Sequence, residues 1–160
     1  MVEKGVVNAR FQIPHLKHIE YILAAKMRCQ KLYIGITNPD PSCVRESVND
    51  EIRSTPAANP LTYLERYEMI QGAMEEFNVP LTAYEIVPFP IHRPEYITQY
   101  TPSDGVYYLG ICDGWDEEKL KILKGLDLKT EVLWRRSKEE CGVTGTWIRS
   151  CIATGQEWEH

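Results

Sequence analysis

Short apolar stretches alternate with segments of helical periodicity along this chain. Runs typical of strands occur at 4–7, 31–37, 81–89, 105–111 and 130–134. Apolar positions recur every three or four residues at 14–29, 59–77 and 116–123, which predicts helices, and 96–100 suits a further short helix. In the second helix the residues expected in the core are Leu64, Tyr67, Ile70, Met74 and Phe77. This order predicts an α/β fold: a doubly wound, Rossmann-like, parallel five-stranded sheet with helices on both faces.

Composition narrows the class of protein. A chain of 160 residues with 43% hydrophobic content suits a single domain, 1–160. The net charge of −5 argues against a nucleic-acid partner. The five cysteines are scattered and form no C-x-x-C pair, so we expect reduced thiols. Without a leader sequence or a membrane-length apolar run, we expect a cytoplasmic protein with no membrane partner. We expect Trp134 in the core and Trp115 at the surface.

Two segments carry residues suited to binding an anion. Arg10, Gln12, His15 and His18 follow the first strand and lead into the first helix. Backbone N–H groups at a helix start favour phosphate, and side chains three residues apart share one face of the helix. Near the end of the chain, hydroxyl residues and a glycine at 144–146 precede Arg149, which predicts a second helix start that binds an anion.

These segments resemble the motifs of a known superfamily. Residues 10–18, Arg-Phe-Gln-Ile-Pro-His-Leu-Lys-His, resemble the R-F-Q-P-x-H-x-G-H motif of nucleotidyltransferases related in fold to class I aminoacyl-tRNA synthetases. Residues 59–66 resemble N-P-F-T-x-x-E-R, and residues 144–149 are similar to S-G-T-x-I-R. Residues 87–93 and 155–158 place the resemblance closest to archaeal-type nicotinamide mononucleotide (NMN) adenylyltransferases. Three motifs in the family's order are more specific than one.

The resemblance implies roles for individual residues. The residues with catalytic roles would be His15, His18 and Arg149. The nucleotide-binding residues would be Ala9, Arg10, Phe11, Gln12, Lys17, Thr144, Gly145 and Thr146. The positions for the substrate or a mobile loop, taken from the motifs and from their place after strands, are Arg45, Asn59, Thr62, Arg66, His92, Arg93 and Tyr96. No metal ligand is assigned to the protein, and Mg²⁺ would bind with the nucleotide.

The implied reaction transfers a nucleoside monophosphate from a nucleoside triphosphate to a small phosphate or phosphonate acceptor, with release of pyrophosphate. The main prediction is ATP with NMN, which would place the enzyme in NAD biosynthesis. One alternative is a CTP-dependent cytidylyltransferase acting on a phosphoryl or phosphonyl alcohol. Another is a nucleotide-binding regulator without turnover, because Lys17 stands where the family has glycine. We expect a homo-oligomer, as is common for the family.

Overall fold

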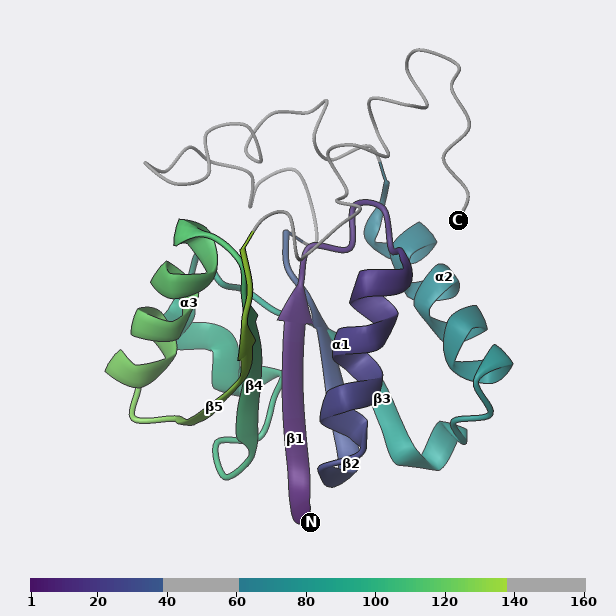
Figure 1. Cartoon of the computed structure of the whole chain (residues 1–160), viewed down its shortest axis with the longest axis horizontal. Helices are drawn as coiled ribbons and strands as arrows, with labels where there is room; N and C mark the ends of the chain where they lie inside the picture. Colours follow the sequence, from purple (N-terminus) through teal and green to yellow (C-terminus); the bar gives the residue numbers. More distant parts are fainter. Residues whose placement is uncertain (39–60, 138–160) are drawn as a thin grey trace.

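The computed structural model describes residues 1–38 and 61–137. The elements are β1 (Val2–Ala9), α1 (Leu16–Lys26), β2 (Cys29–Ile36), α2 (Tyr63–Glu76), the 3₁₀ helix η3 (Leu81–Ala83), β3 (Tyr84–Pro88), the 3₁₀ helix η4 (Pro94–Gln99), β4 (Val106–Ile111), α3 (Gly114–Gly125) and β5 (Lys129–Arg135). The five strands are parallel, in the order β3-β2-β1-β4-β5 (Figure 1). The predicted doubly wound α/β fold is confirmed.

The strand β1 is the centre of the sheet because it is apolar enough to be covered on both faces. Residues Gly5 to Asn8 are all buried, with β2 on one side and β4 on the other. The chain runs outward from β1 through β2 to β3 and then returns to β4 on the opposite side. In sheets of this kind ligands bind at the point where the strand order reverses, beyond the carboxyl ends of the strands. Here that point lies between β1 and β4.

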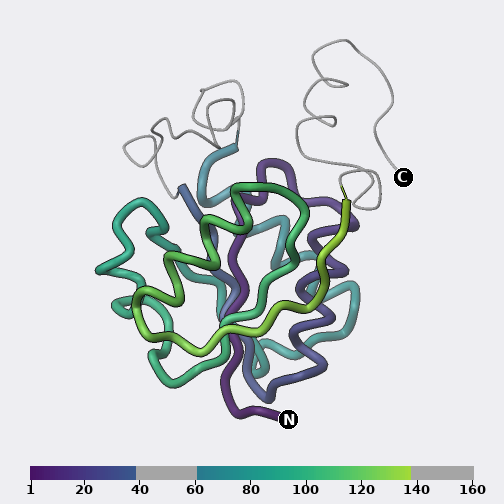
Figure 2. Tube along the Cα trace, turned by 60° about the vertical axis from the view of Figure 1, so that its left-hand side comes forward, coloured from purple at the N-terminus to yellow at the C-terminus, as the bar shows by residue number. Residues whose placement is uncertain are grey.

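Two hydrophobic cores cover the two faces of the sheet. Ile22, Ile34 and Ile70 belong to the core beneath α1 and α2, whereas Tyr107 and Leu123 belong to the core beneath α3. Neighbouring residues of β1 serve different cores, Val6 the second and Val7 the first, because successive side chains of a strand point to opposite faces. The helices accordingly flank the sheet on both sides (Figures 1 and 2).

Local capping signals start the later helices. Thr62 accepts a hydrogen bond from the Glu65 N–H at 3.1 Å, and Glu65 accepts one from the Thr62 N–H at 2.9 Å, so α2 begins with a reciprocal capping box. Asp113 caps α3 by accepting from the Asp116 N–H at 3.0 Å. The Thr62 hydroxyl and the Glu65 and Asp113 carboxylates satisfy backbone donors that would otherwise lack a partner at the helix starts.

Some predictions about burial are wrong. Leu64 and Phe77, expected in the core, are 63% and 48% exposed. The buried face of α2 instead follows Arg66, Ile70 and Met74, one residue per turn. Because arginine is polar, Arg66 was left out of the predicted apolar face. That face was therefore placed too far toward Leu64 and Phe77.

The aromatic and sulfur side chains also differ in part from expectation. Trp115 is 9% exposed and belongs to the core beneath α3 instead of the surface. Trp134 is half-buried. Cys29 is a buried free thiol, and burial raises its pKa. Cys112 is disulfide-bonded, contrary to the expectation of reduced thiols.

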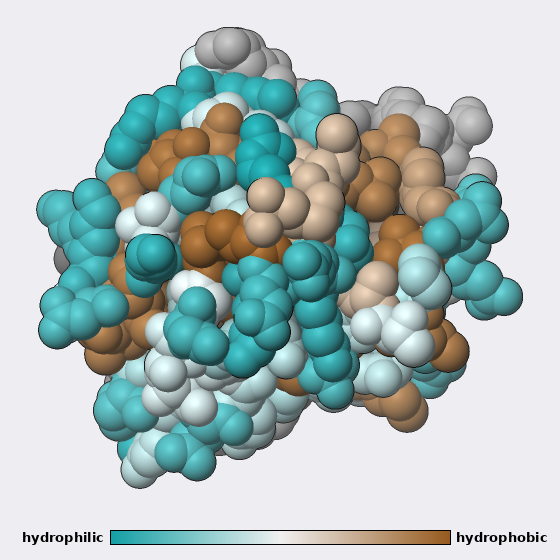
Figure 3. All heavy atoms as spheres, turned by 90° about the horizontal axis from the view of Figure 1, so that it is seen from below, coloured by the Kyte–Doolittle hydropathy of each residue, from teal (hydrophilic) through white to brown (hydrophobic). Residues whose placement is uncertain are grey.

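The amino ends of the strands form the edge of the sheet opposite the predicted site. Hydrophobic and hydrophilic side chains are interspersed on this face (Figure 3). Within residues 1–38 and 61–137, none of the helices has the length and hydropathy needed to span a bilayer.

Candidate active site

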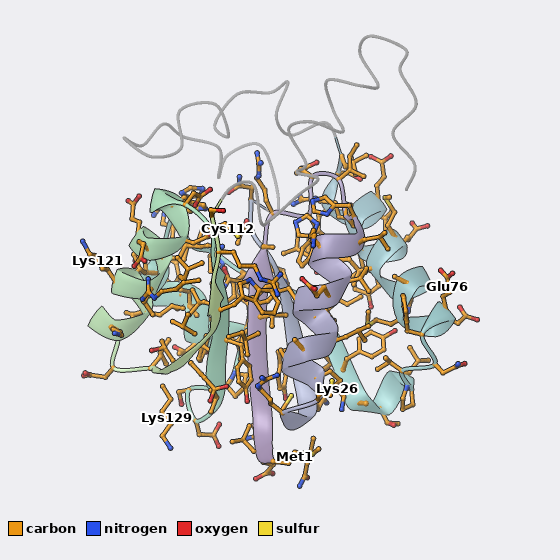
Figure 4. All side chains as sticks on the ribbon, viewed as in Figure 1. Met1, Lys26, Glu76, Cys112, Lys121 and Lys129 are labelled. Carbon is orange, nitrogen blue, oxygen red and sulfur yellow. The ribbon has the colours of Figure 1, made fainter. Side chains whose placement is uncertain are left out.

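The loops after the strands meet at one edge of the sheet. In Figure 4, Cys112 follows β4 at this edge, whereas Met1 and Lys129 lie toward the opposite one. The predicted motif at 10–18 leaves β1 at the same edge and leads into α1. The carboxyl ends of the strands therefore bring together the segments on which the predicted chemistry depends.

Two histidines form the start of α1. His15 is the N-cap residue, and its Nδ1 accepts a hydrogen bond from the Lys17 N–H at 3.2 Å. The Nδ1 of His18 accepts one from the His15 N–H at 3.3 Å. This is a capping box built from imidazoles instead of the usual hydroxyl and carboxyl groups. The helix start thereby fixes both rings.

The capping box also sets the tautomer of each ring. A neutral imidazole carries one proton, so a ring whose Nδ1 accepts a hydrogen bond carries its proton on Nε2. The rings of His15 and His18 stack with their centroids 4.0 Å apart and their planes 25° from parallel. Two N–H donors are thus held close to each other at a helix N-terminus, where the helix dipole favours an anion.

Phe11 packs against the His18 ring. Its ring is fully buried in the core under α1 and α2, and its edge contacts the His18 ring at 4.9 Å between centroids. The backbone of Phe11 has a φ of 54°, a left-handed conformation that costs a bulky residue roughly 1–3 kcal/mol. Burial of the ring offsets this cost. Phe11, predicted to bind nucleotide, thus positions a histidine in this structure.

Gln12 joins the motif to the start of α2. Its Nε2 donates to the Leu61 carbonyl at 2.9 Å, and its Oε1 accepts from the Leu61 N–H at 2.8 Å. The side chain is 3% exposed. The amide predicted to line the mouth of the nucleotide pocket therefore fixes the position of residue 61 relative to the loop after β1.

Arg66 holds three loops at once. Its guanidinium donates to the carbonyls of Arg10 at 2.9 Å, Thr37 at 2.8 Å and Asn38 at 2.7 Å, and its Nε donates to Thr62 at 3.1 Å. The residue is 1% exposed, and desolvation lowers its pKa to about 10, so the group stays charged at neutral pH. It ties the ends of β1 and β2 to α2. The prediction that Arg66 positions the mobile loop before α2 concerns a segment outside the described residues and stays a prediction.

A second group of polar residues lies after β2 and β3. The His92 ring nitrogen Nε2 is 2.7 Å from Oδ1 of Asn38, and the ring stacks near Trp115 with centroids 6.3 Å apart. Asn38 has a φ of 50°, which asparagine tolerates better than most residues. His92 is therefore held between the loop after β2 and helix α3. Arg93 and Tyr96, predicted beside it, are exposed.

Strands β1 and β4 stop pairing before they reach the edge of the sheet formed by the carboxyl ends of the strands. Pairing between the two strands is confined to Gly5 with Val106 and Val6 with Tyr107. Beyond it, the Tyr21 hydroxyl of α1 accepts from the Asn8 N–H at 3.3 Å and donates to the Tyr108 carbonyl. A side chain thus takes the place of the next hydrogen bond between the strands. Burial raises the pKa of Tyr21, so the hydroxyl keeps its proton.

Replacing Tyr21 with phenylalanine should destabilise the protein by about 1–3 kcal/mol, because the Asn8 N–H and the Tyr108 carbonyl each lose a partner in a buried setting. Chemical denaturation monitored by circular dichroism measures this change. Tyr63→Phe is the matched control, since no described hydrogen bond uses the Tyr63 hydroxyl. An equal effect of the two substitutions would contradict the bridging role of Tyr21.

On the α3 side of the same opening, a lysine and an asparagine meet. The Lys119 ammonium donates to Oδ1 of Asn8 at 3.2 Å and lies 3.9 Å from Oδ1 of Asp116. Asn8 and Lys119 are 2% and 7% exposed. Asp116 also accepts from the Cys112 N–H at 2.9 Å. A charged group is thus buried at the point where the strand order reverses.

A shallow cavity of about 370 Å³ lies where β4 and β5 end beside the start of α3. Its lining residues are Ile111, Cys112, Asp113, Glu117, Arg135 and Arg136. Arg135 pairs with Glu117 at the surface. The Arg136 guanidinium lies 4.0 Å from the centroid of the Trp134 ring and pairs with Glu20 of α1 at 2.7 Å. Arg135 and Arg136 follow the strand predicted at 130–134, and neither was predicted to belong to the site.

The structure brings part of the predicted site together. The predicted residues in the described part of the chain are Ala9, Arg10, Phe11, Gln12, His15, Lys17, His18, Thr62, Arg66, His92, Arg93 and Tyr96. The predicted residues outside it are Arg45, Asn59, Thr144, Gly145, Thr146 and Arg149. The predicted meeting of His18 with Arg149 therefore stays a prediction.

Sequence reasoning missed Asn8, Tyr21 and Lys119. One feature of the sequence could have indicated Asn8, which is a polar residue directly after the apolar pair Val6-Val7 and directly before the motif. A search of the described residues for three or more His, Cys, Asp or Glu side chains placed to hold a metal finds none.

Comparisons with known proteins indicate the class of enzyme to which this chain is similar. The chain is 45% identical over 156 residues to the phosphonoformate cytidylyltransferase of Streptomyces viridochromogenes, covering 98% of this chain and 84% of that protein. It is 24% identical over 167 residues to the nicotinamide-nucleotide adenylyltransferase of Thermococcus kodakarensis, covering 99% of this chain and 77% of that one. A bifunctional NMN adenylyltransferase/ADP ribose pyrophosphatase from Francisella tularensis, solved with AMP and manganese, matches with a TM-score of 0.65 at 15% identity. That likeness, which covers 97% of this chain but 42% of the larger one, concerns the fold. No family model matches the chain.

The fold, the histidine-capped helix start and these relatives define a nucleotidyltransferase. The identity of 45% over nearly the whole chain also shows the family within this class. The chain belongs to the same family as the Streptomyces phosphonoformate cytidylyltransferase.

The comparisons revise the predicted substrate. The resemblance to archaeal-type NMN adenylyltransferases holds at 24% identity, well below the identity to the cytidylyltransferase. The CTP-dependent alternative is therefore better supported than the main prediction of ATP with NMN. Relatives named as enzymes also favour turnover over the alternative of a regulator without catalysis.

Proposed function

We propose that this enzyme transfers a cytidylyl group from CTP to the phosphonate of a small carboxylated phosphonate, with phosphonoformate as the acceptor to test first. A phosphonate oxygen attacks the α-phosphorus of CTP and forms a P–O–P bond. The bond from the α-phosphorus to the oxygen that bridges to the β-phosphate breaks, and pyrophosphate leaves. The 45% identity to a phosphonoformate cytidylyltransferase, over 98% of this chain, is the observation that carries the proposal.

The residues at the start of α1 suit this chemistry. Phosphoryl transfer depends on positioning and on stabilising negative charge, and it requires no covalent nucleophile from the protein. The capping box fixes Nδ1 of each ring and therefore orients the Nε2–H groups of His15 and His18 before substrate binds. Donors that are already oriented stabilise developing charge without paying for reorganisation. Lys17, in the same helical turn, supplies a positive charge beside them.

We propose that magnesium binds together with the nucleotide. Mg²⁺ prefers oxygen ligands and is commonly held through substrate phosphates, where it neutralises their negative charge. We therefore assign its ligands to CTP. Arg149 and residues 144–146, outside the described residues, are proposed from the motif resemblance to contact the same phosphates.

Assays with each combination of two nucleotides and two acceptors test the proposal. The purified enzyme with Mg²⁺ is incubated with CTP or ATP and with phosphonoformate or NMN, and pyrophosphate release is measured. We expect release with CTP and phosphonoformate, and a product whose mass equals that of CMP joined to the acceptor with loss of water. Phosphorus NMR should show a new P–O–P linkage.

The other combinations separate the rival substrates. Release with ATP and NMN alone would replace the proposal with the adenylyltransferase alternative, which the 24% identity to such an enzyme motivates. No pyrophosphate from any combination would contradict the proposal.

A further inference from the structure

The buried pair of Asn8 and Lys119 lies where the sheet opens. Asn8 is still paired with Gly35 of β2, but the pairing of β1 with β4 has ended at Val6. Lys119 reaches Asn8 from α3, the helix that follows β4. The pair therefore lies at the reversal of strand order, the position at which open α/β sheets bind ligands.

The lysine fixes which way the asparagine amide points. An ammonium group has donors and no acceptor, so the atom of Asn8 that faces Lys119 at 3.2 Å must be the oxygen Oδ1. The nitrogen Nδ2 then points away from the lysine. An amide orientation is often ambiguous, but here the chemistry of the neighbour decides it.

The Nδ2 group of Asn8 is a buried donor that has no hydrogen-bond partner among the described residues. Leaving such a group unsatisfied is costly, and buried polar groups in folded proteins nearly always have a partner. An amide N–H beside an ammonium group calls for an acceptor atom that carries negative charge. Asp116 is 3.9 Å from the ammonium, which is too far for a hydrogen bond but close enough to offset its charge.

We propose that Asn8 and Lys119 bind the carboxylate of the acceptor substrate, a group distinct from the phosphonate that attacks CTP. This inference rests on the proposed function. A carboxylate oxygen can accept from Nδ2 of Asn8, and the positive charge of the Lys119 ammonium attracts the carboxylate. The Lys119 side chain is 9% exposed, so a carboxylate bound by the pair would be shielded from solvent. The pair thereby selects an acceptor that carries a carboxylate.

The assignment to the acceptor follows from where the other donors lie. The two histidines that suit the phosphates of CTP start α1, which covers the opposite face of the sheet from α3. Asn8 and Lys119 supply a separate set of donors, two residues before the motif begins. Asn8 lies near the end of β1, and Arg10 begins the loop that leads from β1 to the helix start.

The experiment compares four variants with the wild type: Asn8→Asp, Asn8→Ala, Lys119→Met and, as control, Lys121→Met. Lys121 belongs to the same helix and is exposed. Asn8→Asp keeps an oxygen for the ammonium and keeps the volume of the side chain, but it puts a negative charge where Nδ2 stood. It therefore tests binding even if Asn8→Ala fails to fold. Steady-state kinetics give KM for phosphonoformate and for CTP, and calorimetry gives the affinity for CTP without acceptor.

We expect Asn8→Ala and Lys119→Met to raise KM for phosphonoformate by about 10- to 100-fold, and Asn8→Asp to raise it by about 100-fold or more. The affinity for CTP should stay unchanged in all four variants, and Lys121→Met should match the wild type throughout. The wild type should use methylphosphonate, which lacks the carboxylate, at least about 10-fold less efficiently than phosphonoformate.

Several results would overturn the inference. An equal rise in KM for CTP would assign the pair to the nucleotide instead of the acceptor. Unchanged KM values with a lower melting temperature would mean that Nδ2 bonds a buried water and has a structural role. Equal efficiency with methylphosphonate would also contradict it. These outcomes differ from failure of the proposed function, in which the wild type itself would release no pyrophosphate from CTP and phosphonoformate.

Discussion

Replacing His18 with alanine is expected to lower kcat by about 100- to 1000-fold, the usual effect of removing one donor that stabilises a charged transition state. The substitution removes the Nε2–H donor and also the hydrogen bond from the His15 N–H to Nδ1. CTP binding should weaken much less, because the other contacts to the triphosphate remain. Stopped-flow or steady-state pyrophosphate release, together with calorimetry for CTP, measures the two effects separately.

His18→Asn separates catalysis from helix capping. Asparagine can still accept from the His15 N–H through its side-chain oxygen, but it has no donor in the place of Nε2. We expect His18→Asn to keep the melting temperature close to that of the wild type while kcat falls as far as in His18→Ala. If His18→Asn kept the activity of the wild type, His18 would be a capping residue and the catalytic role would be wrong.

Arg66→Met should destabilise the enzyme by about 3 kcal/mol or more. The methionine fills much of the space but removes the buried donor that the carbonyls of Arg10, Thr37 and Asn38 share. Activity should also fall at temperatures where the variant is still folded, because the loops after β1 and β2 lose their common anchor. Denaturant titration and assays well below the melting temperature measure the two losses.

Two further variants test the cause of this loss. Arg66→Lys keeps the charge, but an ammonium is a compact point charge and cannot match the fork of a guanidinium. We therefore expect it to recover only part of the lost stability. Arg93→Met removes an arginine that is exposed, and its effect on stability should stay within about 0.5 kcal/mol. If Arg66→Met behaved like Arg93→Met, the proposed anchoring of the three loops would be wrong.

Local signals in the sequence determined the elements and their order. Apolar runs of strand length predicted the five strands. The helices predicted at 59–77 and 116–123 are present, but they begin at Tyr63 and Gly114, where Thr62 and Asp113 act as caps that were not predicted. The motifs at 10–18, 59–66 and 144–149 predicted the class of enzyme, because each consists of residues that are neighbours in the sequence. Properties of this kind depend on contacts over three or four residues, which a sequence displays directly.

Only the tertiary structure decided which polar groups meet. Gln12 bonds a residue 49 positions away, and Asn8 bonds one 111 positions away. Such pairs form only after the strand order has brought distant segments to the same edge of the sheet. The same reason explains Leu64, Phe77 and Arg66, since the face of α2 that is buried depends on what packs against it. Periodicity gives the existence of an apolar face, but hydrogen bonds across the chain decided that an arginine would occupy it.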